Sequence, residues 1–378
     1  MARGTPARAA PLAGARRLGL PAALITMATA APAASQTPRD AAAAAWRLRT
    51  TAGADVGWDS NVFQADSARG DGYGRLGGTA TLSRESSRHR LSGYAELNRK
   101  FYWELSQADE WQAYLDLTAS RDLGRLLAGA GLRSAYVDRR YLDREGNLLP
   151  RKTFASFSNR LLAFADLRLA RDLYAAAEGG YRLRDYEETS GLTSLDYGEW
   201  TAELGLTRYL PARLSVRLQG RLEERAYDQR LAADAGGFLD AGNPELRLRQ
   251  VEGEARVRKR WGREGLLEAV VALRSSQDVF EDELSYGQRS LAVRARHDLS
   301  GTRLAVRGAV VGRDFDLRRS GTGEPLEENF VTFDAEVERP LLSGATARGA
   351  YSLFRRSANE AGGSYTIGTL QAGVAYEF

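Results

Sequence analysis

GSYTIGTLQAGVAYEF, residues 363–378, alternates between apolar and polar side chains up to the last residue. One face of this stretch carries Leu370, Ala372, Val374, Tyr376 and Phe378, and the other carries Thr369, Gln371, Gly373 and Glu377. A period of two is typical of a β-strand, because successive side chains of a strand point to opposite sides. A helix would distribute the same apolar residues around its whole circumference. The stretch therefore predicts a strand with one apolar face.

The same period continues through the chain, for example in RLSVRLQGRLEER (213–225) and VEGEARVRKRW (251–261). These segments are longer than the roughly 5–6 residues of an ordinary globular strand. Their apolar faces are rich in Gly, Ala, Leu and Val, and their polar faces carry rows of Arg and Glu. An apolar outside and a charged inside are typical of a transmembrane β-barrel, which also satisfies every backbone hydrogen bond in lipid. The sequence predicts an all-β, antiparallel, up-and-down transmembrane barrel.

Short turns and longer polar connections alternate strictly along the chain, as in outer-membrane barrels with short periplasmic turns and long outside loops. We expect about sixteen strands, within a range of about 14–18. The predicted strands are 46–58, 73–84, 88–104, 110–122, 125–141, 154–170, 173–187, 194–209, 212–228, 245–261, 265–280, 285–299, 302–318, 328–339, 344–357 and 364–378. With an even number of strands, the N- and C-terminal ends of the chain lie on the same side of the membrane, which we expect to be the periplasmic side.

The first 35 residues differ from the rest, with four arginines, no acid, a short apolar run and small residues near Ser35. This pattern predicts a signal peptide (1–35), followed by a short periplasmic segment (36–45) and the barrel (46–378). Removing these four arginines from the 53 basic residues leaves 49, which equals the 49 acidic residues. A chain without net charge is not expected to bind nucleic acid. It also has no cysteine, and therefore no disulfide or thiolate metal site.

GWDSNVFQ, residues 57–64, ends the first predicted strand. Its alternation places Val56, Trp58 and Val62 on the lipid face, and Asp59 and Asn61 at the mouth of the pore. We expect Trp58, Trp261, Tyr376 and Phe378 to form part of the aromatic girdles at the membrane surfaces. Asp59, Asn61 and a loop residue such as Asp66 could share a calcium ion, which needs six to eight oxygen ligands. The favoured interpretation is a turn whose Asp and Asn side chains bond backbone N–H groups, without a metal.

Rows of arginine on the predicted inner face suggest two functions. The expected pore-lining residues are Asp59, Asn61, Arg182, Arg184, Arg213, Arg217, Arg221, Arg225, Glu252, Glu254, Arg256, Arg303, Arg307 and Arg348. In one interpretation, Glu252 and Glu254 pair across strands with Arg217, Arg221 or Arg225 and hold the shape of the barrel. In the other, the arginines form a path for anions, because guanidinium groups bind carboxylate and phosphate.

Catalysis is not expected. The chain has two histidines, His89 and His297, and both lie in predicted periplasmic turns without a recognisable triad. Neighbouring acids such as Glu252 and Glu254 are flanked by arginine and are interpreted as charge ladders. No catalytic residue, metal or cofactor is predicted.

The terminal VAYEF (374–378) resembles the C-terminal signature of Gram-negative outer-membrane proteins. VGWDSNVFQ (56–64) and YAELNRKFYWE (94–104) resemble outer-membrane β-barrels encoded with exopolysaccharide loci, the β-barrel porin type 2 group. The opening is also similar to the barrel part of surface lipoprotein assembly modifiers. The resemblance to the porin type 2 group implies passive translocation of an exopolysaccharide or its fragments across a Gram-negative outer membrane. The implied partners are outer-membrane lipid, lipopolysaccharide, the polysaccharide itself and the barrel assembly machinery, through the C-terminal strand. The alternatives are a diffusion porin for small anions and an adhesin-like barrel that acts through its outer loops.

Overall fold

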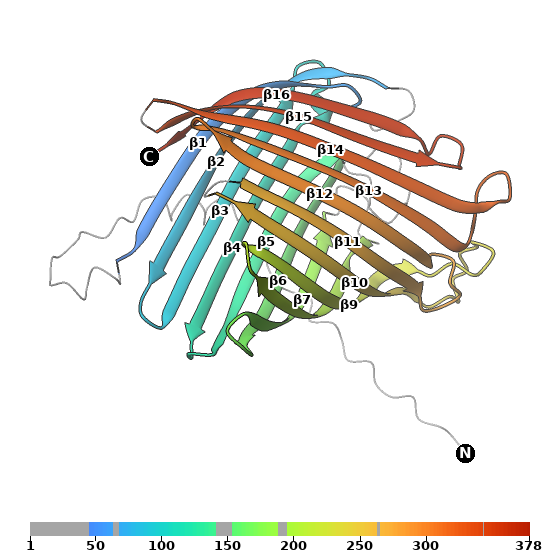
Figure 1. The fold of residues 1–378 in the computed structure, drawn as a ribbon. Helices are drawn as coiled ribbons and strands as arrows, with labels where there is room; N and C mark the ends of the chain where they lie inside the picture. Colours follow the sequence, from blue (N-terminus) through green and yellow to red (C-terminus); the bar gives the residue numbers. More distant parts are fainter. Residues whose placement is uncertain (1–44, 63–67, 141–152, 188–194, 263–264, 343) are drawn as a thin grey trace. The chain divides into compact units, whose positions relative to one another are not determined.

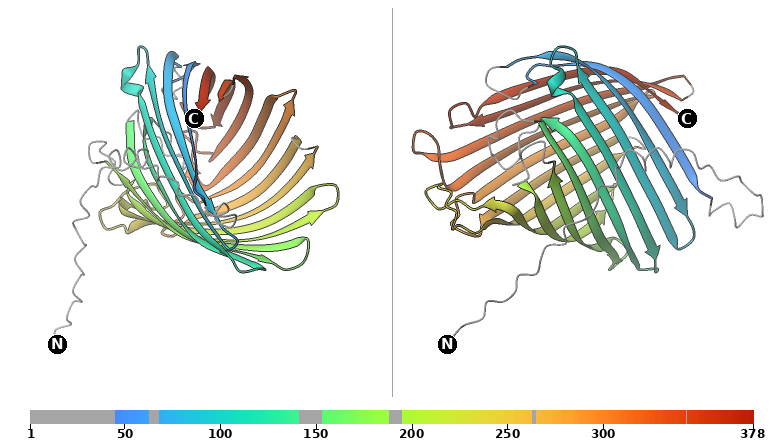
Figure 2. Two further views of the ribbon diagram at one scale, coloured as in Figure 1. Left: turned by 90° about the vertical axis from the view of Figure 1, so that its left-hand side faces the viewer. Right: turned by 180° about the vertical axis from the view of Figure 1, so that it is seen from behind.

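The computed structural model describes residues 45–62, 68–140, 153–187, 195–262, 265–342 and 344–378. The compact unit that contains them is a closed barrel in which each strand pairs antiparallel with its neighbours in the chain, and β1 pairs with β16 (Figures 1 and 2). The described residues contain no helix of the length and apolar character that crossing a membrane requires. The predicted class of fold and the sixteen strands are confirmed.

The strands follow the predicted segments closely. They are β1 (Arg47–Asp59), β2 (Asp71–Glu85), β3 (His89–Tyr102), β4 (Glu110–Asp122), β5 (Leu126–Arg140), β6 (Thr153–Arg168), β7 (Leu173–Tyr186), β8 (Tyr197–Leu210), β9 (Leu214–Leu231), β10 (Glu245–Trp261), β11 (Gly265–Asp278), β12 (Tyr286–Leu299), β13 (Thr302–Arg319), β14 (Pro325–Leu342), β15 (Ala345–Ala358) and β16 (Tyr365–Glu377), with the short 3₁₀ helix η2 (Ser106–Ala108) between β3 and β4. The largest differences from the predicted bounds are in β9, which ends at Leu231 instead of residue 228, and in β14, which is longer than predicted at both ends.

The register of the strands decides which side chains face inward, because directly paired residues lie on the same face of a sheet. Leu218 of β9 pairs with Leu206 of β8 and Ala255 of β10, and both leucines are exposed on the outside. On the opposite face, Glu199 pairs with Arg182 and Arg225 and has no accessible surface. A soluble sheet buries its apolar face, whereas this sheet exposes it to the surroundings and encloses its charges.

The barrel has two different ends. At one end, connections of two to four residues join β2 to β3, β4 to β5 and so on, and this end also carries the start of β1 and the end of β16. We call it the short-turn end, and the opposite end, with connections of five to thirteen residues, the long-loop end. Tight turns require left-handed backbone at the short-turn end, for example at Ser300 and Gly301 between β12 and β13 (φ 52° and 81°). The predicted alternation of connections is therefore present.

The loop between β9 and β10, residues 232–244, is the longest connection at the long-loop end. Its turns are fixed by Asp234, whose Oδ1 accepts hydrogen bonds from the backbone N–H groups of Gly236 and Phe238 (both 2.9 Å). Phe238 and Leu239 at its tip are 73% and 72% exposed. The tip therefore packs on no part of the inner wall.

Candidate functional site: the inner wall

A seam of side-chain contacts crosses the junction between the first and last strands. Asp55 of β1 lies on the inner face, is 4% exposed, and accepts hydrogen bonds from Arg75 of β2 (2.9 Å) and Arg348 of β15 (2.5 Å to each oxygen). Arg348 reaches Asp55 across β16, which lies between their two strands. One carboxylate thus connects three strands other than by backbone pairing.

Gly373 of β16 makes this contact possible. It is paired directly with Asp55 on one side and Arg348 on the other. A Cβ atom at this position would lie 2.0 Å from Asp55 Oδ1 and 2.3 Å from the carbonyl oxygen of Ala54. Only a residue without a side chain leaves room for the ion pair.

Asp59 forms the second part of the seam. Its carboxylate accepts hydrogen bonds from the ammonium group of Lys100 and the hydroxyl of Tyr102, both on β3, and from the hydroxyl of Thr369 on β16 (2.6 Å). Lys100 Nζ also lies 3.9 Å from the centre of the Tyr73 ring, a cation–π geometry. These donors engage both carboxylate oxygens of Asp59.

The two residues after Asp59 extend the seam to the long-loop end. The Ser60 hydroxyl accepts a hydrogen bond from the Gly368 N–H (2.7 Å), and the Asn61 amide donates one to the carbonyl oxygen of Thr366 (3.3 Å). In the described part of the chain, the side chains of Asp59, Ser60 and Asn61 bond β3 and β16. The turn that the predicted cap would close continues into residues 63–67, which lie outside the described residues. Asp66, the other proposed ion ligand, lies outside the described residues. In the described part of the chain, no group of three or more His, Asp or Glu side chains is arranged for a metal ion.

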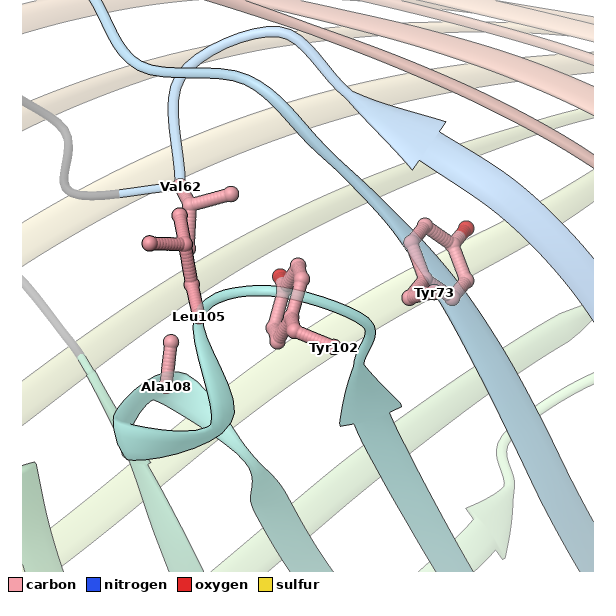
Figure 3. Close-up of a cluster of buried hydrophobic side chains, with 5 residues drawn as sticks. All are labelled: Val62, Tyr73, Tyr102, Leu105 and Ala108. Atoms are coloured by element: carbon pink, nitrogen blue, oxygen red, sulfur yellow. The ribbon is translucent and has the colours of Figure 1, made fainter.

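Val62 does not lie on the lipid face, as the alternation had suggested, because β1 ends at Asp59. It is buried in a small cluster with Leu105 and Ala108 of the β3–β4 connection and with Tyr73 and Tyr102 (Figure 3). The backbone N–H groups of Glu104 and Leu105 donate to Asp71 Oδ2 (both 2.9 Å). The β3–β4 connection is thus packed against Val62, which follows β1, and against Asp71 at the start of β2.

Most of the predicted pore-lining arginines lie on the inner face and pair with carboxylates. The pairs are Arg182 with Glu199, Arg217 with Glu203, Arg221 with Glu223, Arg225 with Glu199 and Glu223, Arg256 with Glu254, Arg303 with Glu338 and Asp298, and Arg348 with Asp55. Arg184 donates to the Ser156 hydroxyl (3.1 Å). These contacts agree with the interpretation of the arginine rows as charge ladders.

Two details of that interpretation are wrong. Glu252 pairs with Arg274 of β11 (2.6 Å) and Glu254 with Arg256 of its own strand (2.8 Å), instead of with arginines of β9. Arg213 lies in the turn between β8 and β9 with left-handed backbone (φ 59°), and its guanidinium donates to the Gly262 carbonyl. It therefore lies at the short-turn end and not in the row of Arg217, Arg221 and Arg225.

A buried triad near the long-loop end was not predicted. Glu328 of β14 has no accessible surface and lies between Arg313 of β13 (3.2 Å) and Arg356 of β15. The Arg313 guanidinium also lies 4.4 Å from the centre of the Tyr286 ring. The alternation of the three strands places all three charges on the inner face, but their alignment depends on the register, which a single strand does not reveal.

The predicted girdle residues are all on the outside. Trp58 is 51% exposed near the long-loop end, and Trp261, Tyr376 and Phe378 are exposed at the short-turn end. Both histidines are also on the outer face, within strands rather than turns: His89 begins β3, and the His297 ring lies 6.2 Å from that of Trp261.

Asp196 lies just before β8, at the rim of the long-loop end. Its Oδ1 accepts a hydrogen bond from the Tyr186 N–H (2.7 Å). Burial, together with the neighbouring carboxylates of Asp185 and Asp228, raises the pKa of Asp196 from 3.8 to about 6. This group changes its charge near neutral pH.

No family model matches the chain. No curated protein matches it either. The fold is similar to that of solved outer-membrane proteins. OmpTdeltaL8, a loop L8 deletion mutant of the outer membrane protein OmpT of Vibrio cholerae, aligns with a TM-score of 0.51 and 12% identity over 89% of this chain and 100% of that one.

In-vitro folded OmpT of the same organism aligns with a TM-score of 0.50 and 10% identity, over 89% of this chain and 98% of that one. A bacterial polysaccharide outer membrane secretin aligns with a TM-score of 0.43 and 8% identity, over 86% and 98% of the two chains. At these identities the similarity concerns the fold. The chain is a closed, antiparallel, sixteen-stranded barrel of the porin-like outer-membrane type.

Proposed function

We propose that the protein is an outer-membrane channel for the passive passage of hydrophilic solutes, with a saccharide chain or its fragments as cargo. The observation that carries the proposal is the division of the wall into an apolar outer face and an inner face of paired charges. Such an inner face is compatible with water, while the outer face is compatible with lipid. The resemblance of residues 56–64 and 94–104 to barrels of exopolysaccharide loci supports the saccharide cargo.

The pairing of the inner charges also favours an uncharged cargo. An arginine that shares its charge with a carboxylate at 2.8 Å, as Arg256 does with Glu254, attracts a passing anion weakly. The inner wall then presents many hydrogen-bond donors and acceptors with little net field, which suits a hydroxylated solute.

A diffusion porin for small anions is the second candidate, and one observation favours it. Arg294 of β12 and Arg307 of β13 are directly paired on the inner face, and both are exposed. Within the described residues, neither has a carboxylate within ion-pair distance. Two arginines side by side attract a carboxylate or phosphate. An adhesin-like role would instead use the exposed tip at Phe238 and Leu239.

We further propose that the long-loop end faces outward and that the N- and C-terminal ends of the chain lie on the periplasmic side. Lipid and lipopolysaccharide would then surround the outer face, and the assembly machinery would engage β16. Neither histidine lies on the inner face, which supports a channel rather than an enzyme.

The test is the conductance of the full mature chain in planar bilayers, combined with swelling of liposomes in sugars of increasing size. We expect open-channel conductance, similar permeability for K⁺ and Cl⁻, and faster swelling in mono- and disaccharides than in liposomes without protein. Strong preference for Cl⁻ would favour the anion porin, and absence of both conductance and swelling would contradict a channel. Deletion of the gene should reduce secreted polysaccharide, and an unchanged amount would contradict the saccharide cargo.

A further inference from the structure

A recess of about 160 Å³ opens on the inner wall beside the seam, between side chains of β2, β3, β4 and β16. At about 30 Å³ for each water molecule, this volume equals about five waters. The recess can therefore hold one small ring or one unit of a chain, but not an extended oligomer. Every residue that lines it has a polar or charged side chain.

The floor of the recess depends on a glycine of the GWDSN stretch. Gly57 of β1 is paired with Tyr73 on one side and Gln371 on the other, and a Cβ atom on it would lie 2.5 Å from the Tyr73 ring. The ring therefore lies across β1, and its hydroxyl donates to Gln371 Oε1 (3.3 Å). Lys100 covers this ring with its ammonium group, so the contacts available to a ligand are polar.

Each cation around the recess is paired with a carboxylate. The cations are Arg75 and Lys100, which are held by Asp55 and Asp59 of the seam, and Arg348 shares Asp55. Glu110 lines the recess as well, and Glu96 accepts a hydrogen bond from the Asn98 amide, so four carboxylates surround three cations. An isolated anion or cation gains little net attraction in such a neighbourhood.

Three amides complete the lining. Asn98 of β3 and Gln112 of β4 are directly paired, and Gln371 lies on the far side of the Tyr73 ring. An amide side chain offers donors and acceptors at once, as does every hydroxyl of a sugar. Amides and ion-paired charges are thus suited to a neutral ligand with several hydroxyls.

We propose that this recess is a binding subsite for one uncharged sugar unit. The assignment names the class of cargo for the channel proposed above and rests on that proposal for its role in transport. Gln112 and Gln371 contact the sugar hydroxyls, and the seam keeps Arg75 and Lys100 at fixed positions beside them. Sugar acids bind no better than neutral sugars, because every cation beside the recess is already paired with a carboxylate.

The experiment measures equilibrium binding of glucose, maltotriose and glucuronate to the full mature barrel in detergent by calorimetry, and then their blockade of single-channel current. Gln112→Leu and Gln371→Leu should each weaken maltotriose binding about tenfold, through the loss of hydrogen bonds to hydroxyls. Gln219→Leu on β9 is the matched control, because it makes the same change on the inner wall away from the recess. It should leave the affinity unchanged. Folding of each variant is checked by its heat-dependent mobility in SDS gels.

The two proposals fail differently. Maltotriose affinity that is absent, equal in all variants, or much weaker than that of glucuronate overturns the subsite, whatever the conductance. A barrel that conducts without binding any of the three probes keeps its channel function and loses the subsite. A barrel that binds maltotriose in the predicted manner but does not conduct keeps the subsite and loses the channel.

Discussion

Asp55 and Arg348 are 293 residues apart in the chain, and they form two hydrogen bonds of 2.5 Å across an intervening strand. Backbone pairing alone closes a barrel by joining each strand to its neighbours. Here side chains add a second connection, which passes over β16 and ends on the inner face of β1. The closure of this barrel is therefore fixed by specific residues as well as by the sheet.

Gly373→Ala should destabilise the barrel by about 2 kcal/mol, because the new methyl group collides with the Asp55 carboxylate and the Ala54 carbonyl. The measurement is the urea concentration at half-unfolding, followed by tryptophan fluorescence in detergent. Gly253→Ala is the control, since a Cβ on Gly253 meets no atom within 4 Å. It should be neutral or stabilise by up to about 1 kcal/mol. Equal effects of the two changes would contradict the role assigned to Gly373.

Asp59→Ala should cost about 3 kcal/mol, because it leaves Lys100 largely buried without its carboxylate. The same unfolding measurement tests this change. Glu85→Ala removes the partner of Arg90 in a pair whose side chains are 67% and 61% exposed, and should change stability by less than about 0.5 kcal/mol. If Asp59→Ala proved as mild as Glu85→Ala, the seam would not contribute to stability.

Glu254→Gln should raise the permeability ratio of Cl⁻ to K⁺ about twofold, because it leaves Arg256 without its partner. One unit charge acting over about 10 Å in water is worth about 0.4 kcal/mol, which corresponds to this factor. Reversal potentials in a KCl gradient give the ratio. Arg256→Gln is the complementary variant and should lower it. No change in either variant would mean that ions do not pass near this pair.

Asp196→Asn should make the stability of the barrel less dependent on pH. The pKa of Asp196 is raised in the folded state, so the stability that its proton provides is complete below pH 3.8 and is lost as the pH rises to about 6. The asparagine keeps an acceptor for the Tyr186 N–H and stays neutral. We expect the variant to match the wild type at pH 4 and to exceed it by about 1 kcal/mol at pH 8, after allowing for solvent screening. If the stability of the two proteins changed with pH by the same amount, Asp196 would not be the group responsible.

The orientation of the barrel can be tested with short epitope tags. A tag between Gly236 and Gly237, in the β9–β10 loop, should be accessible to antibody on intact cells if the long-loop end faces outward. A tag between Ser300 and Gly301, in the β12–β13 turn, should become accessible only after the outer membrane is permeabilised. The opposite labelling would reverse the assignment of the two ends.

The sequence alone was sufficient for the architecture, because the period of two and the alternation of turns are local properties. The bounds of β10, Glu245–Trp261, coincide with the predicted segment, and the sixteen strands were counted correctly. The bounds failed where strands continue beyond the apolar band, as β9 does to Leu231. At this end, β9 is held by backbone pairing with β10, and the alternation of apolar residues no longer shows where the strand ends.

The contacts of the inner wall were less predictable. The side of each charge followed from alternation, which placed Arg217, Arg221 and Arg225 correctly. Their partners did not follow from alternation, because Glu252 lies directly opposite both Arg221 of β9 and Arg274 of β11 and forms its ion pair with Arg274. Asp59 was recognised as unusual, but its donors come from β3 and β16, and only the closed barrel brings these strands together.

The position of the seam also has a consequence for the order of assembly. Asp55 and Asp59 belong to β1, whereas their partners Arg348 and Thr369 lie 293 and 310 residues further along the chain, in β15 and β16. Until β15 and β16 pair with β1, each carboxylate has only its partners from β2 or β3, and the charged edge of β1 disfavours pairing with another chain. The edge of β1 thus remains charged until its pairing with β16 closes the barrel.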